Sequence, residues 1–247
     1  MVSKTTWIVA DTHLTRDPEG TLFGVVVRIQ AERARSFLEA NARKGDSLVL
    51  LGDISNDDSQ ESYRCAESLF GSIVSDIELV PGNHDGQLFE TLQFFRPCPR
   101  SRPGPNGWQF HFLDSRGDGE EGRLSRRTLS YLGEAIPADT KHNHAIFFHH
   151  DCLQPFPAGR IGLVEGGNEL VELVLSRSTS RFAIFCAHRH QSFAFGLGNI
   201  TFHSVGAVSC QFEFDGEIPQ LSSPAIEISE VRFLDGHISV HRHRIDQ

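Results

Sequence analysis

The sequence predicts an α/β fold, and two observations lead to that prediction. Short apolar stretches typical of buried strands alternate with segments whose apolar residues recur at helical spacing. The chain has 247 residues, enough for one domain with a large core, and it shows no linker, repeat or low-complexity stretch. We therefore expect a single domain over residues 1–247, with a strand-rich C-terminal part from 200 to 247.

The first part of the chain is expected to alternate strands with helices. The expected strands cover residues 5–10, 47–51 and 77–80, and the expected helices cover 27–42 and 59–70. A short helix is expected to end near Gln93. The four prolines and two glycines between residues 96 and 107 predict an irregular connection.

The second part continues the alternation and then becomes rich in strands. Strands are expected at 108–113, 145–148 and 182–186, with helices at 125–136 and 167–175. Further strands are expected at 200–204, 207–214, 225–233 and 237–244. His237, His241 and His243 alternate along the last of these and are expected at the surface or sheet edge.

Five of the expected strands end in polar residues that can bind a metal ion. These residues are Asp11 and His13, Asp53, Asn83 and His84, His149 and His150, and His188 and His190. Each motif alone could be an ordinary polar turn, but ligands in open α/β sheets gather at the carboxyl ends of the strands. Carboxylate, imidazole and one amide oxygen, without cysteine, suit Mn, Fe or Zn. The pattern therefore predicts a site for two divalent or transition metal ions, while Asp57 and Asp58 are expected to be loop or cap residues.

In this order and spacing the motifs resemble those of the calcineurin-like metallophosphoesterase superfamily, whose pattern runs D-x-H, G-D, G-N-H, H, G-H-x-H. The resemblance covers positions 8 to 190. Within the superfamily the chain is most similar to the bacterial class III cyclic nucleotide phosphodiesterase and glycerophosphodiesterase branch. The motifs that carry this similarity include Asp11-Thr-His-Leu14, Pro81-Gly-Asn-His-Asp85 and Leu113-Asp-Ser115. The resemblance implies a four-layer α/β/β/α sandwich.

The resemblance also implies a role for each site residue. One metal ion would be held by Asp11, His13, Asp53 and His190, and a second by Asp53, Asn83, His149 and His188. Asp53 would bridge the two ions, and His84 would face the phosphate and stabilise or protonate the leaving oxygen. Hydroxide bridging the metal ions would attack the phosphorus in line. The chain departs from the family pattern at Ala187, which replaces a glycine, and at Asp151-Cys152, which replace prolines.

The leading functional hypothesis is hydrolysis of small phosphodiesters such as cyclic nucleotides or glycerophosphodiesters. A phosphomonoesterase on the same site and, less favoured, a non-catalytic scaffold of the same fold remain alternatives. Hydrolysis by a serine or cysteine nucleophile is not supported, because the chain has no Gly-x-Ser-x-Gly motif and no cysteine persuasively placed beside a histidine.

Composition limits the partners and the compartment. The net charge of −9 argues against long nucleic acids, so the expected partner is a small phosphorylated substrate. The segments 14–24 and 151–162 are expected to form an apolar rim with Phe23, Pro155, Phe156 and Pro157, and with only Arg16 and Arg160 as cations. Five cysteines without paired spacing, and no signal peptide or membrane span, predict a cytoplasmic protein. A homodimer is expected from the family resemblance alone.

Overall fold

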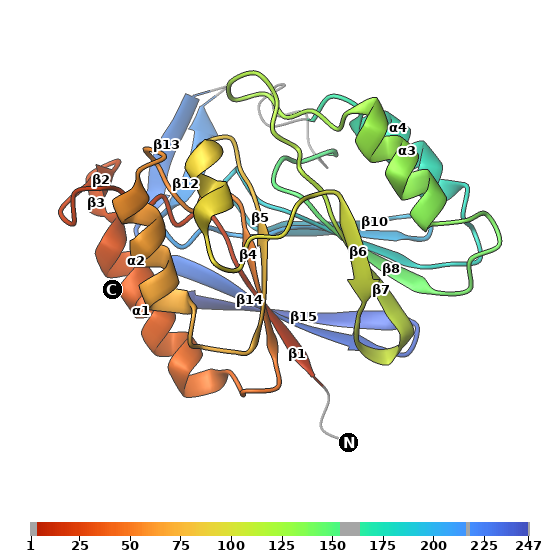
Figure 1. The fold of residues 1–247 in the computed structure, drawn as a ribbon, viewed down its shortest axis with the longest axis horizontal. Coiled ribbons are helices and arrows are strands. Elements are labelled where there is room, and N and C mark those ends of the chain that lie inside the picture. Colours follow the sequence, from red (N-terminus) through yellow and green to blue (C-terminus); the bar gives the residue numbers. More distant parts are fainter. Residues whose placement is uncertain (1–3, 154–163, 216–217, 247) are drawn as a thin grey trace.

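The chain folds as two β-sheets packed face to face between two pairs of helices. The computed structural model describes residues 4–153, 164–215 and 218–246. Helices α1 and α2 cover one outer face, and α3 and α4 cover the other (Figure 1). The expected four-layer α/β/β/α sandwich is thus confirmed. No helix among these residues is long and apolar enough to cross a membrane.

The first sheet has five strands in the order β15-β14-β1-β4-β5. Its members are β1 (Thr5–Val9), β4 (Ser47–Leu51), β5 (Asp76–Val80), β14 (Ile226–Leu234) and β15 (His237–Ile245). Strands β1, β4 and β5 run parallel, whereas β14 and β15 are added antiparallel. The three parallel strands therefore present their carboxyl ends at the same edge of the sheet.

The second sheet has six strands in the order β10-β11-β9-β8-β7-β6. Its members are β6 (Arg100–Pro103), β7 (Trp108–Phe112), β8 (Asn143–Phe147), β9 (Phe182–Cys186), β10 (Phe193–Leu197) and β11 (Ile200–Ser204). The four central strands are parallel, and the edge strands β6 and β10 are antiparallel to their neighbours.

Buried side chains from both sheets form one core between them. Val49 and Val80 of the first sheet belong to the same cluster as Phe110, Phe147 and Phe185 of the second. Phe147 stacks on Phe185 with ring centroids 5.1 Å apart. Burying a side chain of this size stabilises the fold by about 1.5–3 kcal/mol. The interface fixes the two sheets relative to each other, and with them the ends of their strands.

The helices bury apolar faces that their spacing predicts. They are α1 (Val27–Asn41), α2 (Gln60–Phe70), α3 (Arg126–Ala135) and α4 (Gly167–Leu175), with single 3-10 turns at η1 (Gln87–Thr91) and η2 (Pro105–Gly107). Ser59 and Ser125 cap α2 and α3 by accepting hydrogen bonds from backbone N–H groups three residues later. The short helix expected before Gln93 is the 3-10 turn η1.

Two small antiparallel hairpins lie outside the main sheets. One joins β2 (Thr21–Leu22) to β3 (Val25–Val26), and the other joins β12 (Gln211–Asp215) to β13 (Ile218–Ser223). Of these four strands, only β12 coincides with a strand expected from the sequence. Strand β10 is likewise not predicted from the sequence, and it is a short, half-exposed run at 193–197 that contains a glycine.

Two sequence expectations are wrong. The irregular connection expected at 96–107 contains the edge strand β6, which pairs antiparallel with β7. Arg100 and Arg102 of this strand form ion pairs with Glu78 of β5. The strand expected to start at 207 starts at Gln211. Residues 207–210 instead cross the end of β1, where Val208 N donates to Ala10 O at 2.9 Å and Ser209 N donates to Asp11 O at 3.1 Å.

Candidate metal centre

The ends of five parallel strands, three from the first sheet and two from the second, bring their polar residues into one cluster. The ligand atoms of each of four groups lie within 4.8 Å of one another: Asp11, His13 and His190; His13, Asp53 and His84; Asp11, Asp53 and His149; and His149, His150 and His188. The groups share members, so they form one continuous site that spans both sheets.

His13 and His190 face each other through nitrogen atoms that both carry lone pairs. His13 Nδ1 lies 3.0 Å from Asn56 Oδ1, and His190 Nδ1 lies 2.9 Å from Cys210 O, so each Nδ1 carries the proton and donates it. The two Nε2 atoms are then unprotonated, yet they lie only 3.1 Å apart. A cation placed between two such lone pairs removes their repulsion, and this arrangement suits a metal ion.

Asp11 and Asp53 are buried together beside a neutral imidazole. His149 Nε2 lies 2.8 Å from Asp11 Oδ1 and 3.7 Å from Asp53 Oδ2. Burial raises the pKa of the Asp11 carboxyl to about 6. Burial, together with the nearby Asp11 carboxylate, raises the pKa of Asp53 well above its ordinary value. Two carboxylates in this position need a counter-charge, which a bound cation supplies.

Several candidate ligand atoms, in the cluster and on the neighbouring Asn83, are buried without a protein partner in the described part of the chain. They are Asn83 Oδ1, His149 Nδ1 and His150 Nε2. Asn83 Nδ2 donates to Glu120 Oε2 at 3.2 Å, which fixes the orientation of the amide. Because buried polar atoms are nearly always hydrogen-bonded, an unpartnered buried amide oxygen fits a metal ligand.

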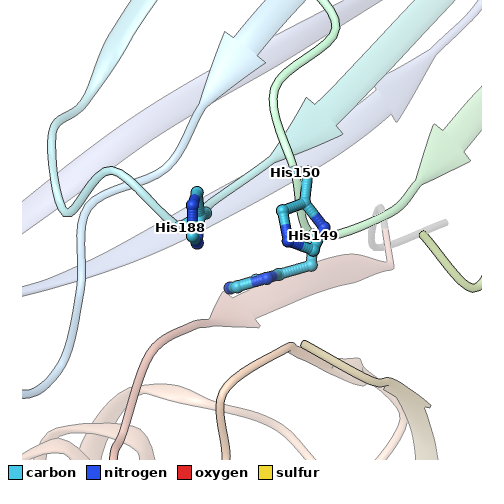
Figure 2. Close-up of side chains that lie close together, drawn as sticks. All are labelled: His149, His150 and His188. Atoms are coloured by element: carbon cyan, nitrogen blue, oxygen red, sulfur yellow. The ribbon is translucent and has the colours of Figure 1, made fainter. Parts of the chain in front are cut away.

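Three histidines form one corner of the cluster. Figure 2 shows His149 and His150 side by side after β8, with His188 facing them from the loop after β9. The His188 ring centroid is 5.1 Å from that of His149 and 4.7 Å from that of His150. Burial lowers the pKa of His149 and His150 to about 3, and that of His188 well below its ordinary value. All three are therefore neutral imidazoles near pH 7, the form that binds metal ions.

Backbone strain is concentrated at the cluster. Five of its residues adopt left-handed φ angles: Asp11 (51°), His13 (45°), Asp53 (45°), His188 (71°) and His190 (51°). A left-handed conformation costs a non-glycine residue about 1–2 kcal/mol, and such strain is typical of functional sites. Ala187 is not in this region, so its replacement of the family's glycine adds no strain.

Two glycines allow the strand ends to approach closely. A Cβ atom at Gly52 would lie 2.1 Å from His149 Cδ2, and one at Gly82 would lie 2.1 Å from Asp53 Oδ1. Gly52 also has a φ of 80°. The Gly-Asp and Gly-Asn-His motifs thus contain glycine because the neighbouring ligands occupy the space of a side chain.

Asp85 joins the loops after β4 and β5. Its carboxylate accepts hydrogen bonds from the backbone N–H groups of Ile54, Ser55 and Gly82, at 3.0–3.2 Å, and from the Tyr63 hydroxyl at 3.1 Å. Asp57 and Asp58 likewise accept backbone hydrogen bonds in these loops, as expected for loop or cap residues. Asp85 therefore positions the cluster without entering it.

A cavity of about 430 Å³ opens beside the cluster. His13, Asp53, His84, His188 and His190 line its inner end. The other lining residues are Leu22, Phe23, Glu120, Phe212, Phe214 and Pro219. The expected apolar rim is therefore present at Leu22 and Phe23 of the segment 14–24. The other apolar lining residues that the structure describes come from the hairpin β12–β13, which the sequence did not assign to the rim.

The rest of the expected rim is placed differently or not at all. Pro155, Phe156, Pro157 and Arg160 lie outside the residues that the structure describes. Asp151, which replaces a proline of the family pattern, would repel a second phosphate only if it pointed into the cavity. It is instead fully buried and is not among the described lining residues, and its carboxylate lies 3.9 Å from Arg189 Nε. Repulsion of a substrate phosphate by Asp151 is therefore not supported.

All eight metal-binding or catalytic residues expected from the sequence lie at this site. Asp11, His13, Asp53, His84, His149, His188 and His190 belong to the cluster, and Asn83 hydrogen-bonds to Glu120 at the cavity wall. The ligand sets implied by the family resemblance leave out His150, although the sequence places it among the polar strand-end residues. Glu120 was not predicted at all, because it comes from an unremarkable polar loop. The terminal histidines lie elsewhere, and His243 bonds to Glu230 on β14.

We expect metal affinity to fall as the pH drops below about 6. Asp11 holds its proton up to about pH 6 in the metal-free protein, and Asp53 holds its proton above its usual range as well. Metal binding must displace these protons, so affinity should decrease at least tenfold per pH unit below pH 6. Titrating metal-free protein with Mn²⁺ or Zn²⁺ by calorimetry between pH 5 and 7.5 measures this. Constant affinity over that range would contradict it.

The model of the calcineurin-like phosphoesterase family matches residues 4–241 of the chain. Glycerophosphodiester phosphodiesterase GpdQ of Enterobacter lignolyticus is 29% identical over 199 residues, covering 74% of this chain and 69% of that protein. The 3′,5′-cyclic adenosine monophosphate phosphodiesterase CpdA of Escherichia coli is 28% identical over 192 residues, covering 74% and 68%. A dimetal phosphatase from Danio rerio shares the fold with a TM-score of 0.71 and 13% identity, covering 98% of this chain and 96% of that one.

Proposed function

The chain belongs to the calcineurin-like phosphoesterase family and is a phosphoester hydrolase, and we propose that it cleaves small phosphodiesters at a centre of two metal ions. Asp11, His13, Asp53 and His190 would hold one ion, and Asp53, Asn83, His149 and His188 the other. The observation that carries the proposal is the pair of unprotonated Nε2 atoms of His13 and His190, 3.1 Å apart beside the buried carboxylates. Among the residues that the structure describes, the ion-pair partners found for Asp11 and Asp53 are neutral histidines, which do not balance the carboxylate charge.

Two bound cations would polarise the phosphoryl oxygens and lower the pKa of coordinated water from about 15.7 towards 7. The protein then needs no nucleophilic side chain. The role of its own residues is to position the ions and the substrate at the inner end of the cavity. Manganese, iron and zinc all suit the mixed nitrogen and oxygen ligands.

His84 is proposed to donate a proton to the leaving oxygen. Its Nδ1 lies 3.2 Å from Asn56 O and donates to it, while the ring lines the cavity. Its backbone N–H donates to Asp53 Oδ1 at 3.0 Å, so the ring is fixed relative to the proposed bridging carboxylate. In the imidazolium form, Nε2 carries a proton that can pass to the substrate.

The cavity favours diesters over monoesters and polymers. No lysine or arginine appears among its described lining residues, so a dianionic monoester gains no protein cation beyond the metal ions. The net charge of −9 gives no general attraction to long nucleic acids. The names of the bacterial relatives, which include a glycerophosphodiesterase and cyclic nucleotide phosphodiesterases, support the same choice. A homodimer, a cytoplasmic location and a single domain remain predictions from the sequence.

The direct test compares turnover of bis(p-nitrophenyl) phosphate with that of p-nitrophenyl phosphate after loading with Mn²⁺, Fe²⁺ or Zn²⁺. We expect kcat/KM to be at least tenfold higher for the diester, because the lining residues that the structure describes offer no protein cation for the second charge of a monoester. A higher value for the monoester would identify a phosphomonoesterase. No turnover with either substrate, despite full metal loading, would favour the scaffold alternative.

Asp53→Ala should lose both metal ions, because the Asp53 carboxylate belongs both to the group with His13 and His84 and to the group with Asp11 and His149. Asn83→Ala should lose mainly the second ion. Elemental analysis of the purified variants, against about two ions per chain in the parent, measures the loss. Asp139→Ala, an exposed carboxylate on the loop after α3, is the matched control and should keep its metal. Full loading of Asp53→Ala would remove the bridging role.

His84→Ala should keep its metal ions but lose roughly 10²–10⁴ in kcat, the usual contribution of a positioned acid or base. The loss should be smaller with nitrophenolate as leaving group, because that group departs without a proton. Kinetics on a nitrophenyl diester and on an alkyl diester measure the difference. An equal loss with both would show that His84 stabilises charge and does not transfer a proton.

A further inference from the structure

The turn between β2 and β3 carries a phenylalanine where its geometry favours asparagine or glycine. Leu22 pairs with Val25, so Phe23 and Gly24 form a two-residue connection. Their φ angles are 49° and 80°, as in the type I′ turn, which prefers Asn-Gly. Positive φ is rare for a bulky aromatic residue. Where core packing does not require the aromatic side chain, such a strained residue points to a function. The Phe23 side chain is indeed 49% exposed.

The Phe23 ring is the outermost of three aromatic rings that lead outward from the cluster of candidate metal ligands. It meets Phe212 of β12 edge to face, with centroids 4.9 Å apart. Phe212 in turn stacks on His190 with centroids 4.1 Å apart and planes 4° from parallel. The strained turn thus holds an aromatic edge at the mouth of the cavity, in line with a proposed metal ligand.

The outer half of the cavity is almost wholly apolar. Its described lining there consists of Leu22, Phe23, Phe212, Phe214 and Pro219, which we call the aromatic wall. Glu120 is the one charged residue among the described lining residues outside the metal cluster, and its carboxylate accepts a hydrogen bond from Asn83. A phosphate at the inner end would place its organic substituent against this wall.

We propose that the aromatic wall binds a planar, uncharged ring of the substrate, so that nucleoside phosphodiesters are preferred over glycerol diesters. This inference rests on the proposed phosphodiesterase function. Planar bases stack on aromatic side chains without needing hydrogen-bond partners. The hydroxyl groups of glycerol would be desolvated against Leu22, Phe212 and Pro219 without partners, which opposes their binding.

A quaternary ammonium headgroup fits the wall less well than a base. Such cations need several open aromatic faces around them. Phe212 has one face covered by the His190 ring, and the Arg189 guanidinium lies 4.5 Å from the centroid of the Phe214 ring. A second cation over Phe214 would be repelled by Arg189. The wall therefore offers a slot for a neutral ring and no cage for a cation.

Phe23→Asn tests the proposal, because it should improve the turn while removing the ring. With the metal-loaded enzyme, KM for cyclic AMP should rise roughly ten- to hundredfold, the effect expected for the loss of one stacking partner. KM for glycerophosphocholine should change less than twofold. Metal content should be unchanged, and Tm should stay level or rise. Phe23→Tyr should retain the parent KM. Ile29→Asn changes a similarly exposed apolar residue on α1 that is not among the described lining residues of this cavity, so it should behave as the parent.

Two results would overturn the inference while leaving the proposed function intact. One is equal or better kcat/KM of the parent for glycerophosphocholine than for cyclic AMP, and the other is an equal rise of both KM values in Phe23→Asn. If neither diester is cleaved, the proposed function fails. Ligand binding without turnover then tests the aromatic wall separately. Calorimetry should then still show AMP bound at least tenfold more tightly than glycerol 3-phosphate, with the difference lost in Phe23→Asn. Equal affinities for AMP and glycerol 3-phosphate would contradict the proposed role of the aromatic wall.

Discussion

The burial of Asp11 and Asp53 next to each other is the constraint on which the rest of the site depends. Two adjacent carboxylates inside a protein repel each other and lose their hydration, so they ionise together only with a counter-charge. The surrounding imidazoles cannot supply it, because burial lowers the pKa of His13, His149 and His190 and keeps them neutral. The site is therefore arranged as a set of neutral and anionic donors that a cation completes.

The surrounding fold holds this unfavourable arrangement in place. Backbone hydrogen bonds tie the loop after β1 to the loop after β4, with Asp11 N donating to Gly52 O at 3.1 Å and His13 N donating to Asp53 O at 2.9 Å. Asp85 connects the next loop through three further backbone N–H groups. The two sheets share one core, so the left-handed residues at the strand ends cannot relax separately. Strain at the site is balanced by packing behind it.

The sequence predicted which side chains gather at the strand ends, because the signals for this are local. A buried strand followed directly by Asp11, Asp53 or His149 places the side chain at a sheet edge, and parallel topology brings the edges together. The strands at 47–51, 182–186 and 200–204 and the helix at 167–175 have the bounds expected of them. Strand β6 was missed because its own residues are mostly arginine and proline, which carry no strand pattern, although it pairs antiparallel with β7. Its arginines form ion pairs with Glu78, which is distant in the chain.

The lining of the outer cavity could not be predicted from the sequence in the same way, because its residues come from two separate hairpins. Phe23 and Phe212 are 189 positions apart in the chain, and no periodicity relates them, yet their rings meet over the site. The residues that would perform the chemistry are thus encoded by strand ends, which many sequences of this fold can share. The residues that face the organic part of a substrate lie on hairpins outside both sheets, where substitutions disturb no core packing. Substrate specificity can therefore change at these hairpins while the cluster of candidate metal ligands and its supporting hydrogen bonds stay the same.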